Sequence, residues 1–269
     1  NYEQLLKRPV FQANNLLRII KPIFEKVKKE GDKALRYYSA QFDGIEEEGF
    51  VLKKEALEQI ASDCNEKLKN AIDVAAKNIR KFHEAQKTDV VSVETTQGVL
   101  CWQEKRAIER IGLYIPGGSA PLFSTVLMLA VPAQIAGCNE IVLCTPPNKK
   151  GEIANEILYT ASLCGVKKRV KVGGSQAIAG LTFGTPSIPK VQKIFGPGNQ
   201  FVTVAKQLAT KFGVAIDMPA GPSELMVLAD ESANASYVAS DLLSQAEHGS
   251  DSQVILVTTS NELINAVCS

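Results

Sequence analysis

Two polar side chains near the end of the sequence could bind a metal ion. Gln245 and His248 lie in the run DLLSQAEHGSDSQV, with Glu247 between them. Apolar residues at helical spacing predict a helix from Ala235 to Glu247, which Gly249 would end. Because residues three apart on a helix share a face, the amide oxygen of Gln245 and a ring nitrogen of His248 would point the same way.

These two residues would form only part of a metal site. Zinc in proteins takes about four ligands, and both of these are neutral. The chain has two histidines, His83 and His248, so the other ligands must be carboxylates, water or groups from outside the chain. We interpret His83, beside an apolar stripe at a basic helix end, as a structural or solvated residue. Taken alone, Gln245 and His248 would also fit an ordinary solvated helix end.

Three loops of small residues could bind a nucleotide or a phosphate group. PGGS at 116–119, GGSQ at 173–176 and GPGN at 196–199 each follow a predicted strand and precede a predicted helix. Glycines let backbone amides approach a ligand closely, and a helix N-terminus favours negative charge. The usual fingerprint G-x-G-x-x-G is absent, because Phe201 stands where the third glycine would be. Any dinucleotide would therefore be held in a different way from the usual Rossmann manner.

Several side chains next to these loops could have more than one role. Tyr114 precedes PGGS at a strand end, where its ring could stack on a ligand and its hydroxyl could hydrogen-bond, or it could belong to the core. The segment DMPAGPSE at 217–224 bridges two predicted strands, and Ser223 and Glu224 would project at the start of the second.

Alternating strands and helices must position the loops. The pattern predicts a parallel sheet covered by helices on both faces, and ligands bind such sheets at the carboxyl ends of the strands. The expected strands are 111–115, 141–144, 169–172, 191–195 and 214–216, and the expected helices are 122–136, 152–164, a short one after 176, and 201–212.

The residues before and after this region predict separate parts. An apolar face predicts a helix that Gly31 ends, a second stripe predicts one long helix from Lys53 to Gln86, and a hairpin turns at Gln97–Gly98. We therefore predict an α/β fold: a Rossmann-like parallel sheet preceded by N-terminal helices and a β-hairpin, with the start of a second α/β unit. The predicted domains are a helical region with a hairpin arm at 1–109, a Rossmann-like domain at 110–222, and the incomplete second unit at 223–269.

The composition is that of a soluble enzyme. Apolar residues make up 45% and charged residues 22% of the 269 residues, and the formal net charge is +1. That charge gives no electrostatic reason to expect binding to nucleic acid or to an anionic membrane. The six cysteines form no CxxC pair, which favours reduced core thiols of a cytoplasmic protein. Because the sequence does not start with Met and ends inside an expected helix, we expect it to be part of a longer protein.

Five stretches of the sequence resemble the histidinol dehydrogenase family. They are IGLYIPGGSAPLFSTVLMLAVPAQIAGC, GGSQAIAGLTFGT, IFGPGNQFVTVAKQ, DMPAGPSE and LLSQAEHG, which stand in the family's order and cover most of residues 110–250. The N-terminal helices and the hairpin resemble the family more loosely. The resemblance implies an NAD- and zinc-dependent oxidoreductase of histidine biosynthesis that oxidises L-histidinol to L-histidine in two steps.

The resemblance also implies roles for single residues. Tyr114, Gln176 and Asn199 would contact NAD, and Ser223 would contact the substrate. Gln245 and His248 would bind both zinc and substrate. The family completes its zinc site with an aspartate later in the chain and a histidine of the partner subunit, which implies a homodimer. Its Glu–His pair for acid–base work lies downstream of Ser269, so no catalytic acid or base is expected within this chain.

Several alternatives stay open. The chain could be part of a histidinol dehydrogenase, part of a related zinc- and NAD-dependent dehydrogenase of another alcohol, or a catalytically incomplete binding or dimerising fragment. On its own we expect it to be inactive. Asn199 also has an alternative to contacting NAD, since it could cap the helix that begins at Gln200, a role that Asn fills well.

Overall fold

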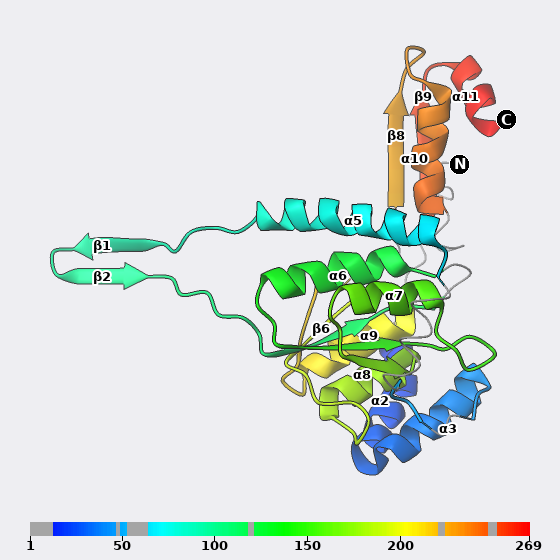
Figure 1. The fold of residues 1–269 in the computed structure, drawn as a ribbon. Helices are drawn as coiled ribbons and strands as arrows, with labels where there is room; N and C mark the ends of the chain where they lie inside the picture. The colour runs from blue at the N-terminus through cyan, green and yellow to red at the C-terminus, as the bar shows by residue number, and fades with distance from the viewer. Residues whose placement is uncertain (1–12, 47–48, 53–63, 118–120, 220–223, 247–251) are drawn as a thin grey trace. The chain divides into compact units, whose positions relative to one another are not determined.

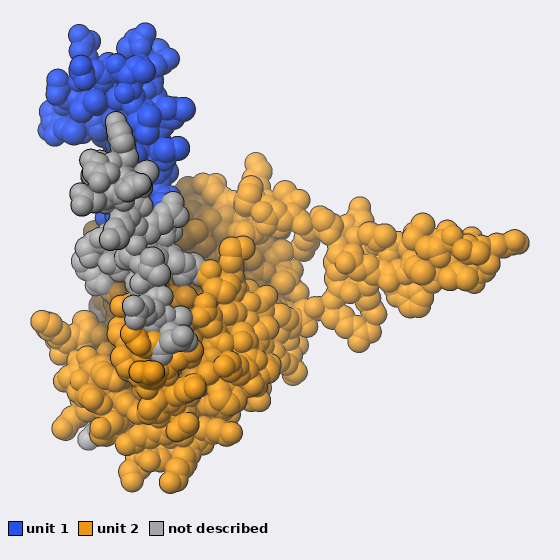
Figure 2. All heavy atoms as spheres, turned by 180° about the vertical axis from the view of Figure 1, so that it is seen from behind, with its two compact units in different colours: residues 1–11, 220–269 blue, residues 12–219 orange. Residues whose placement is uncertain are grey.

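The chain folds into two compact units. The structure is a computed structural model that describes residues 13–46, 49–52, 64–117, 121–219, 224–246 and 252–269. Residues 12–219 make up the larger unit, and the described part of 220–269 belongs to the smaller one (Figure 2).

A sheet of five parallel strands forms the centre of the larger unit (Figure 1). The strands lie in the order β5-β4-β3-β6-β7, so the chain extends the sheet first to one side of β3 and then to the other. Their bounds are β3 (Arg110–Tyr114), β4 (Glu140–Thr145), β5 (Lys168–Lys171), β6 (Lys193–Phe195) and β7 (Ala215–Ile216). The predicted parallel sheet is confirmed. Its strand order reverses between β3 and β6, and in such sheets ligands bind at the carboxyl ends of the strands at that point.

Helices cover both faces of this sheet. One face packs against α5 (Glu66–Glu84), α6 (Phe123–Ile135) and α7 (Asn155–Leu163). The other packs against α2 (Ala13–Glu30), α3 (Asp32–Asp43), α8 (Gly174–Phe183) and α9 (Gln200–Thr210). This two-sided cover explains why the central strands β3 and β4 are mostly apolar after their first, charged residue.

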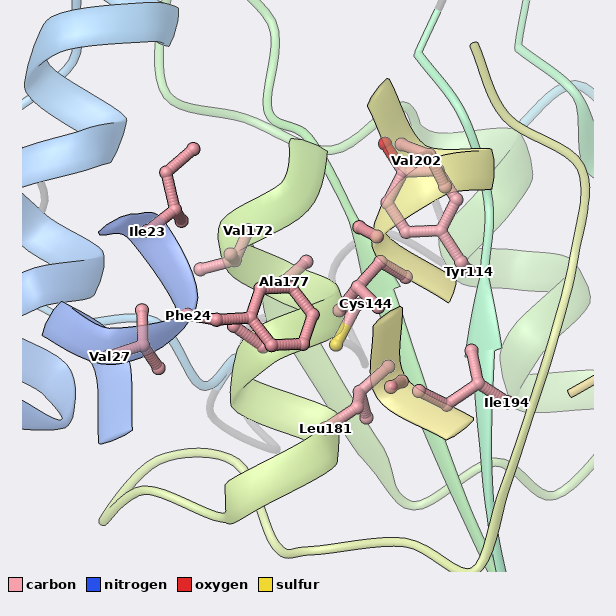
Figure 3. Close-up of a cluster of buried hydrophobic side chains, with 14 of the residues drawn as sticks. Ile23, Phe24, Val27, Tyr114, Cys144, Val172, Ala177, Leu181, Ile194 and Val202 are labelled. Carbon is pink, nitrogen blue, oxygen red and sulfur yellow. The ribbon is translucent and has the colours of Figure 1, made fainter. Parts of the chain in front are cut away.

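Alternation along β3 separates the two cores. Ile111, Leu113 and Ile115 belong to the cluster with α5, α6 and α7. Tyr114 points to the opposite cluster, which is drawn in Figure 3 with side chains from α2, α8 and α9 around the sheet. Successive residues of a strand face opposite sides, so one short strand supplies both cores.

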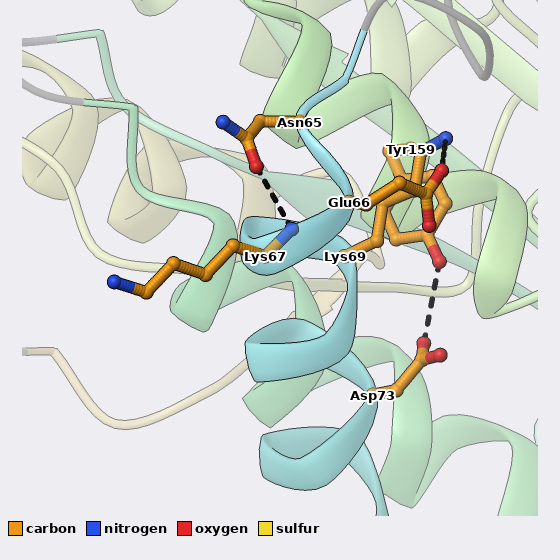
Figure 4. A network of polar contacts seen from close by, with 6 residues as sticks. All are labelled: Asn65, Glu66, Lys67, Lys69, Asp73 and Tyr159. Carbon is orange, nitrogen blue, oxygen red and sulfur yellow. Dashed lines mark hydrogen bonds and ion pairs between the residues drawn. The ribbon is translucent and has the colours of Figure 1, made fainter.

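The N-terminal part differs from the expectation at one helix. Cys64 and Asn65 are not helical, so a single helix from Lys53 to Gln86 is wrong; residues 53–63 lie outside the described residues. The side chain of Asn65 accepts a 2.8 Å hydrogen bond from the backbone N–H of Lys67 and starts α5 there. Figure 4 shows this cap beside the hydrogen bond from Lys69 to Glu66. Asn competes for backbone donors in this way, and that makes it a helix-starting residue.

The apolar stripe of α5 also ends earlier than expected. Ile72 is fully buried, but Phe82, which the spacing placed on the stripe, is 65% exposed. Three helical turns are about eleven residues, so His83 is the residue near the end of α5 that lies on the same side of the helix as Ile72. His83 is half-buried, and its Nδ1 lies 2.8 Å from the amide oxygen of Gln86. The interpretation of His83 as a structural or solvated residue agrees with this contact.

The predicted hairpin is present. β1 (Ser92–Thr96) and β2 (Val99–Trp102) pair antiparallel, and Gly98 between them has a φ of 81°. Every residue of both strands is exposed.

The smaller unit contains one strand–helix–strand sequence and a further helix. β8 (Glu224–Ala229) and β9 (Gln253–Thr258) pair in parallel, with α10 (Ala235–Ala246) between them in the chain and α11 (Asn261–Cys268) after them. The predicted start of a second α/β unit is confirmed. Throughout the described residues of both units, no helix has the length and apolar character needed to span a membrane.

Candidate cofactor site at the carboxyl ends of the sheet

Two of the three small-residue loops of the larger unit meet around one proline. A Cβ atom added to Gly117, after β3, would lie 2.7 Å from a side-chain atom of Pro146, which follows β4. A Cβ added to Gly173, after β5, would lie 2.5 Å from the same side chain. Because Pro146 fills the space that larger side chains would need, these loops accept only glycine without rearrangement. Gly118 and Ser119 of the first loop lie outside the described residues.

Tyr114 connects the end of β3 to the start of α8. Tyr114 is only 4% exposed, and its hydroxyl accepts a 3.0 Å hydrogen bond from the backbone N–H of Gly174. Burial raises the pKa of Tyr114 to about 12, with smaller contributions from Asp43 and Cys144. The phenol therefore stays protonated at neutral pH and holds the first residue of the helix. The arrangement shows the core contact of Tyr114, and its contact with NAD stays a prediction.

Gln176 carries an unsatisfied polar atom next to that contact. The residue is 1% exposed, and its amide oxygen has no hydrogen-bond partner among the residues that the structure describes. It lies beside Gly174, where an added Cβ would come within 2.6 Å of this oxygen. A buried acceptor without a donor is costly, at about 1–3 kcal/mol. A donor that reached this oxygen would offset that cost, and a dinucleotide carries amide and hydroxyl donors.

Asn199 caps the helix that follows the third loop. Its side-chain oxygen accepts a 3.1 Å hydrogen bond from the backbone N–H of Val202, at the start of α9. Asn199 is exposed, and the cap uses only the amide oxygen. The amide nitrogen remains available as a donor, so capping and ligand contact are compatible.

Sequence reasoning did not identify two charged residues behind the third loop. Lys206 on α9 and Asp217 after β7 form an ion pair, and both also bind the backbone of Gly196. One signal was present, since Lys206 interrupts a run of apolar residues at helical spacing on α9. A lysine in such a position needs a partner, because burying an unpaired charge is very unfavourable.

The thiols of the larger unit are not suited to act as nucleophiles. Cys144 on β4 is fully buried, and burial raises its pKa to about 12. Burial likewise raises the pKa of Cys138 and Cys164, so these groups stay protonated. All six cysteines of the chain are free, although Cys101 and Cys268 are exposed rather than in the core.

The smaller unit holds the described part of the predicted metal site. Gln245 lies on α10, and its amide nitrogen donates a 3.2 Å hydrogen bond to the hydroxyl of Ser252. That bond leaves the amide oxygen, the atom that binds metals, as an available acceptor. Glu247, His248 and the predicted substrate residue Ser223 lie outside the described residues, and within those described no three His, Cys, Asp or Glu side chains gather as a metal cluster would require.

Three comparisons agree on one family. The family model described as histidinol dehydrogenase matches residues 6–269. The histidinol dehydrogenase of Bacteroides thetaiotaomicron is 56% identical over 262 residues, covering 97% of this chain and 61% of that protein. The histidinol dehydrogenase of Escherichia coli K12 is 55% identical over 267 residues, covering 98% of this chain and 61% of that protein.

The solved structures give a similar result. The crystal structure of histidinol dehydrogenase from Elizabethkingia anophelis superimposes with a TM-score of 0.92 at 54% identity, covering 99% of this chain and 61% of that one. The chain thus spans 61% of the length of the relatives that it matches.

Proposed function

Since the chain belongs to the histidinol dehydrogenase family, we propose that it carries the NAD-binding side of an enzyme that oxidises L-histidinol to L-histidine in two steps with NAD and zinc. The observation that supports NAD most strongly is the buried, unpartnered amide oxygen of Gln176 beside the start of α8. It lies at the carboxyl ends of parallel strands, where sheets of this type bind ligands.

Each candidate residue has a task in this proposal. Tyr114 holds the first amide of α8 in place. Gln176 accepts a hydrogen bond from a donor of the cofactor, and the amide nitrogen of Asn199 donates one. Bound NAD supplies the hydride acceptor of the reaction.

The zinc side of the proposal rests on the smaller unit. Gln245 would bind the metal through the amide oxygen that its contact with Ser252 leaves available, and His248 would bind beside it. Ser223 would contact the substrate. Zinc supplies positioning of the substrate's imidazole and amine. The remaining ligands would come from the rest of the family sequence and from the partner subunit of a cytoplasmic homodimer.

On its own the chain should not oxidise histidinol. A general base must take the alcohol proton as hydride leaves, and the family's Glu–His pair stands beyond Ser269. The test is NADH absorbance with histidinol, NAD and zinc present, and no steady production is expected. Production that a His248→Ala change abolishes would contradict this expectation and would also exclude a non-catalytic binding fragment.

NAD binding is tested directly at Gln176. Replacing Gln176 with Leu removes the orphaned oxygen, so the free protein should keep or gain stability. If that oxygen contacts the cofactor, the NAD affinity should fall by roughly two- to tenfold, the value of one hydrogen bond. Isothermal titration with NAD, next to urea unfolding without it, measures both quantities.

Thr182 on the same helix provides the control. Its buried hydroxyl already has a partner, the backbone oxygen of Ile178 at 2.7 Å. A Thr182→Val change should lower stability and leave NAD affinity unchanged. Absence of saturable NAD binding by the unaltered chain would reject the proposed cofactor site.

A further inference from the structure

Gly196 lies in an unusual backbone position at the start of the third loop. Its φ is 128°, and a Cβ atom there would come within 2.0 Å of the backbone oxygen of Tyr114. The loop therefore passes directly against the end of β3, next to the residue whose hydroxyl holds α8. Only glycine allows this approach.

Both backbone polar groups of Gly196 are held by charged side chains. Its N–H donates to a carboxylate oxygen of Asp217 at 2.7 Å. Its carbonyl accepts from the ammonium group of Lys206, also at 2.7 Å. Charge-assisted hydrogen bonds of this kind are shorter and stronger than neutral ones. The orientation of this one residue is thus fixed from two sides.

The two charged residues come from different elements and also pair with each other. Lys206 lies on α9, the helix that the loop opens, and it is only 5% exposed. Asp217 follows β7, the strand beside β6. The pair therefore connects the loop, the helix after it and the neighbouring strand. Removing either partner would leave a buried group without compensation.

We propose that Lys206 and Asp217 are positioning residues for the cofactor loop. Because they occupy both polar groups of Gly196, a ligand at this loop meets the backbone from Gly198 onward and the side chain of Asn199. The pair would set the direction in which those groups point before the cofactor arrives. This inference rests on the proposed binding of NAD.

The test compares Asp217→Asn with a matched change elsewhere in the same unit. Asn keeps the shape of Asp217 but removes the charge that pairs with Lys206. The control is Asp32→Asn, because Asp32 also accepts from a loop N–H, that of Ser187 at 3.2 Å, and from its hydroxyl at 2.7 Å. That loop connects α8 to β6, at the opposite end of the strands.

NAD affinity by titration and amide exchange of residues 196–202 are the two measurements. Asp217→Asn should weaken NAD binding by about tenfold, because the loop groups that meet the cofactor would no longer be held in one direction before it binds. It should also speed exchange of the Gly196 amide. Asp32→Asn should change neither, even where both variants lose similar stability. Lys206→Arg, which keeps the charge, should retain more NAD affinity than Lys206→Met.

The possible outcomes separate the two proposals. If the unaltered chain binds NAD and Asp217→Asn binds it equally well, the positioning role is overturned and the cofactor site stands. An equal loss in Asp217→Asn and Asp32→Asn likewise overturns it, since general destabilisation then explains the effect. If the unaltered chain does not bind NAD, the cofactor site fails and the positioning role fails with it.

Discussion

The two units contain the same strand–helix–strand pattern but bury it very differently. In the larger unit Leu113 and Leu143 are fully buried, with helices on both faces of the sheet. In the smaller unit Met226 is 64% and Leu228 is 77% exposed on β8. Parallel sheets are normally covered on both faces. Packing therefore fixes Tyr114 and Gln176, whereas one face of the β8–β9 pair is open to solvent within its own unit.

The largest test of this contrast replaces one leucine in each unit. Leu143→Ala should lower the free energy of unfolding of the larger unit by about 2–5 kcal/mol, because it leaves a cavity in a packed core. Leu228→Ala should change stability by less than about 0.5 kcal/mol, since its side chain contributes little burial. Urea unfolding followed by circular dichroism measures both. A cost above about 2 kcal/mol at Leu228 would show that this face is covered in solution, for example by another copy of the chain.

Alkaline pH should weaken the larger unit through its buried acids. Cys144 and Tyr114 are partners in the register of β3 and β4, and burial raises the pKa of each to about 12. Their ordinary pKa values, 9.0 for the thiol and 10.0 for the phenol, apply in the unfolded chain. The unfolded state thus loses these protons first, and stability that is complete below pH 9 falls as the pH rises toward 12.

Each of these two groups can lower the free energy of unfolding by about 1.4 kcal/mol per pH unit between its unfolded and its folded pKa. Unfolding free energies measured at several pH values between 8 and 11 give the slope. Cys144→Ala should remove the loss of stability that begins near pH 9 and leave the loss that is due to Tyr114. An unchanged slope in that variant would refute the assignment to the thiol.

A smaller effect is expected at Asn199, where two roles combine. Asn199→Ala should cost about 1 kcal/mol of stability through loss of the cap. If its amide nitrogen also donates to the cofactor, NAD affinity should fall by roughly two- to tenfold. The matched control is Asn65→Ala, because Asn65 caps α5 with the same kind of bond on the other face of the sheet. Equal stability loss with unchanged NAD affinity in both variants would leave Asn199 as a cap alone.

The smallest effect should occur on the metal side. Among the residues that the structure describes, Gln245 donates one hydrogen bond of 3.2 Å, to Ser252, and its side chain is half-exposed. Gln245→Ala should therefore alter stability by less than about 0.5 kcal/mol. Zinc should bind the chain weakly, since two neutral ligands are about half of a usual set. Nanomolar binding of one zinc per chain in a titration would reveal a ligand set that the present residues do not suggest.

Local patterns in the sequence determined most of the elements. Apolar spacing and glycine positions predicted the parallel sheet, the hairpin and α10, because each depends on residues close together in the chain. The same reasoning failed at Asn65, because its side chain accepts a hydrogen bond from the backbone N–H of Lys67 and starts a helix inside an apolar pattern that had predicted one continuous helix. The division into three domains and the NAD and zinc roles of single residues remain proposals.

Only the tertiary structure decided how the candidate residues behave. The sequence left Tyr114 between core and ligand contact, and packing against α8 buries it and gives its hydroxyl a partner. The orphaned oxygen of Gln176 depends on what surrounds it after folding. Lys206 and Asp217 belong to different elements, and they meet at Gly196 only because β6 and β7 lie side by side. Burial and pairing are properties of neighbours in space, and a sequence pattern specifies only neighbours along the chain.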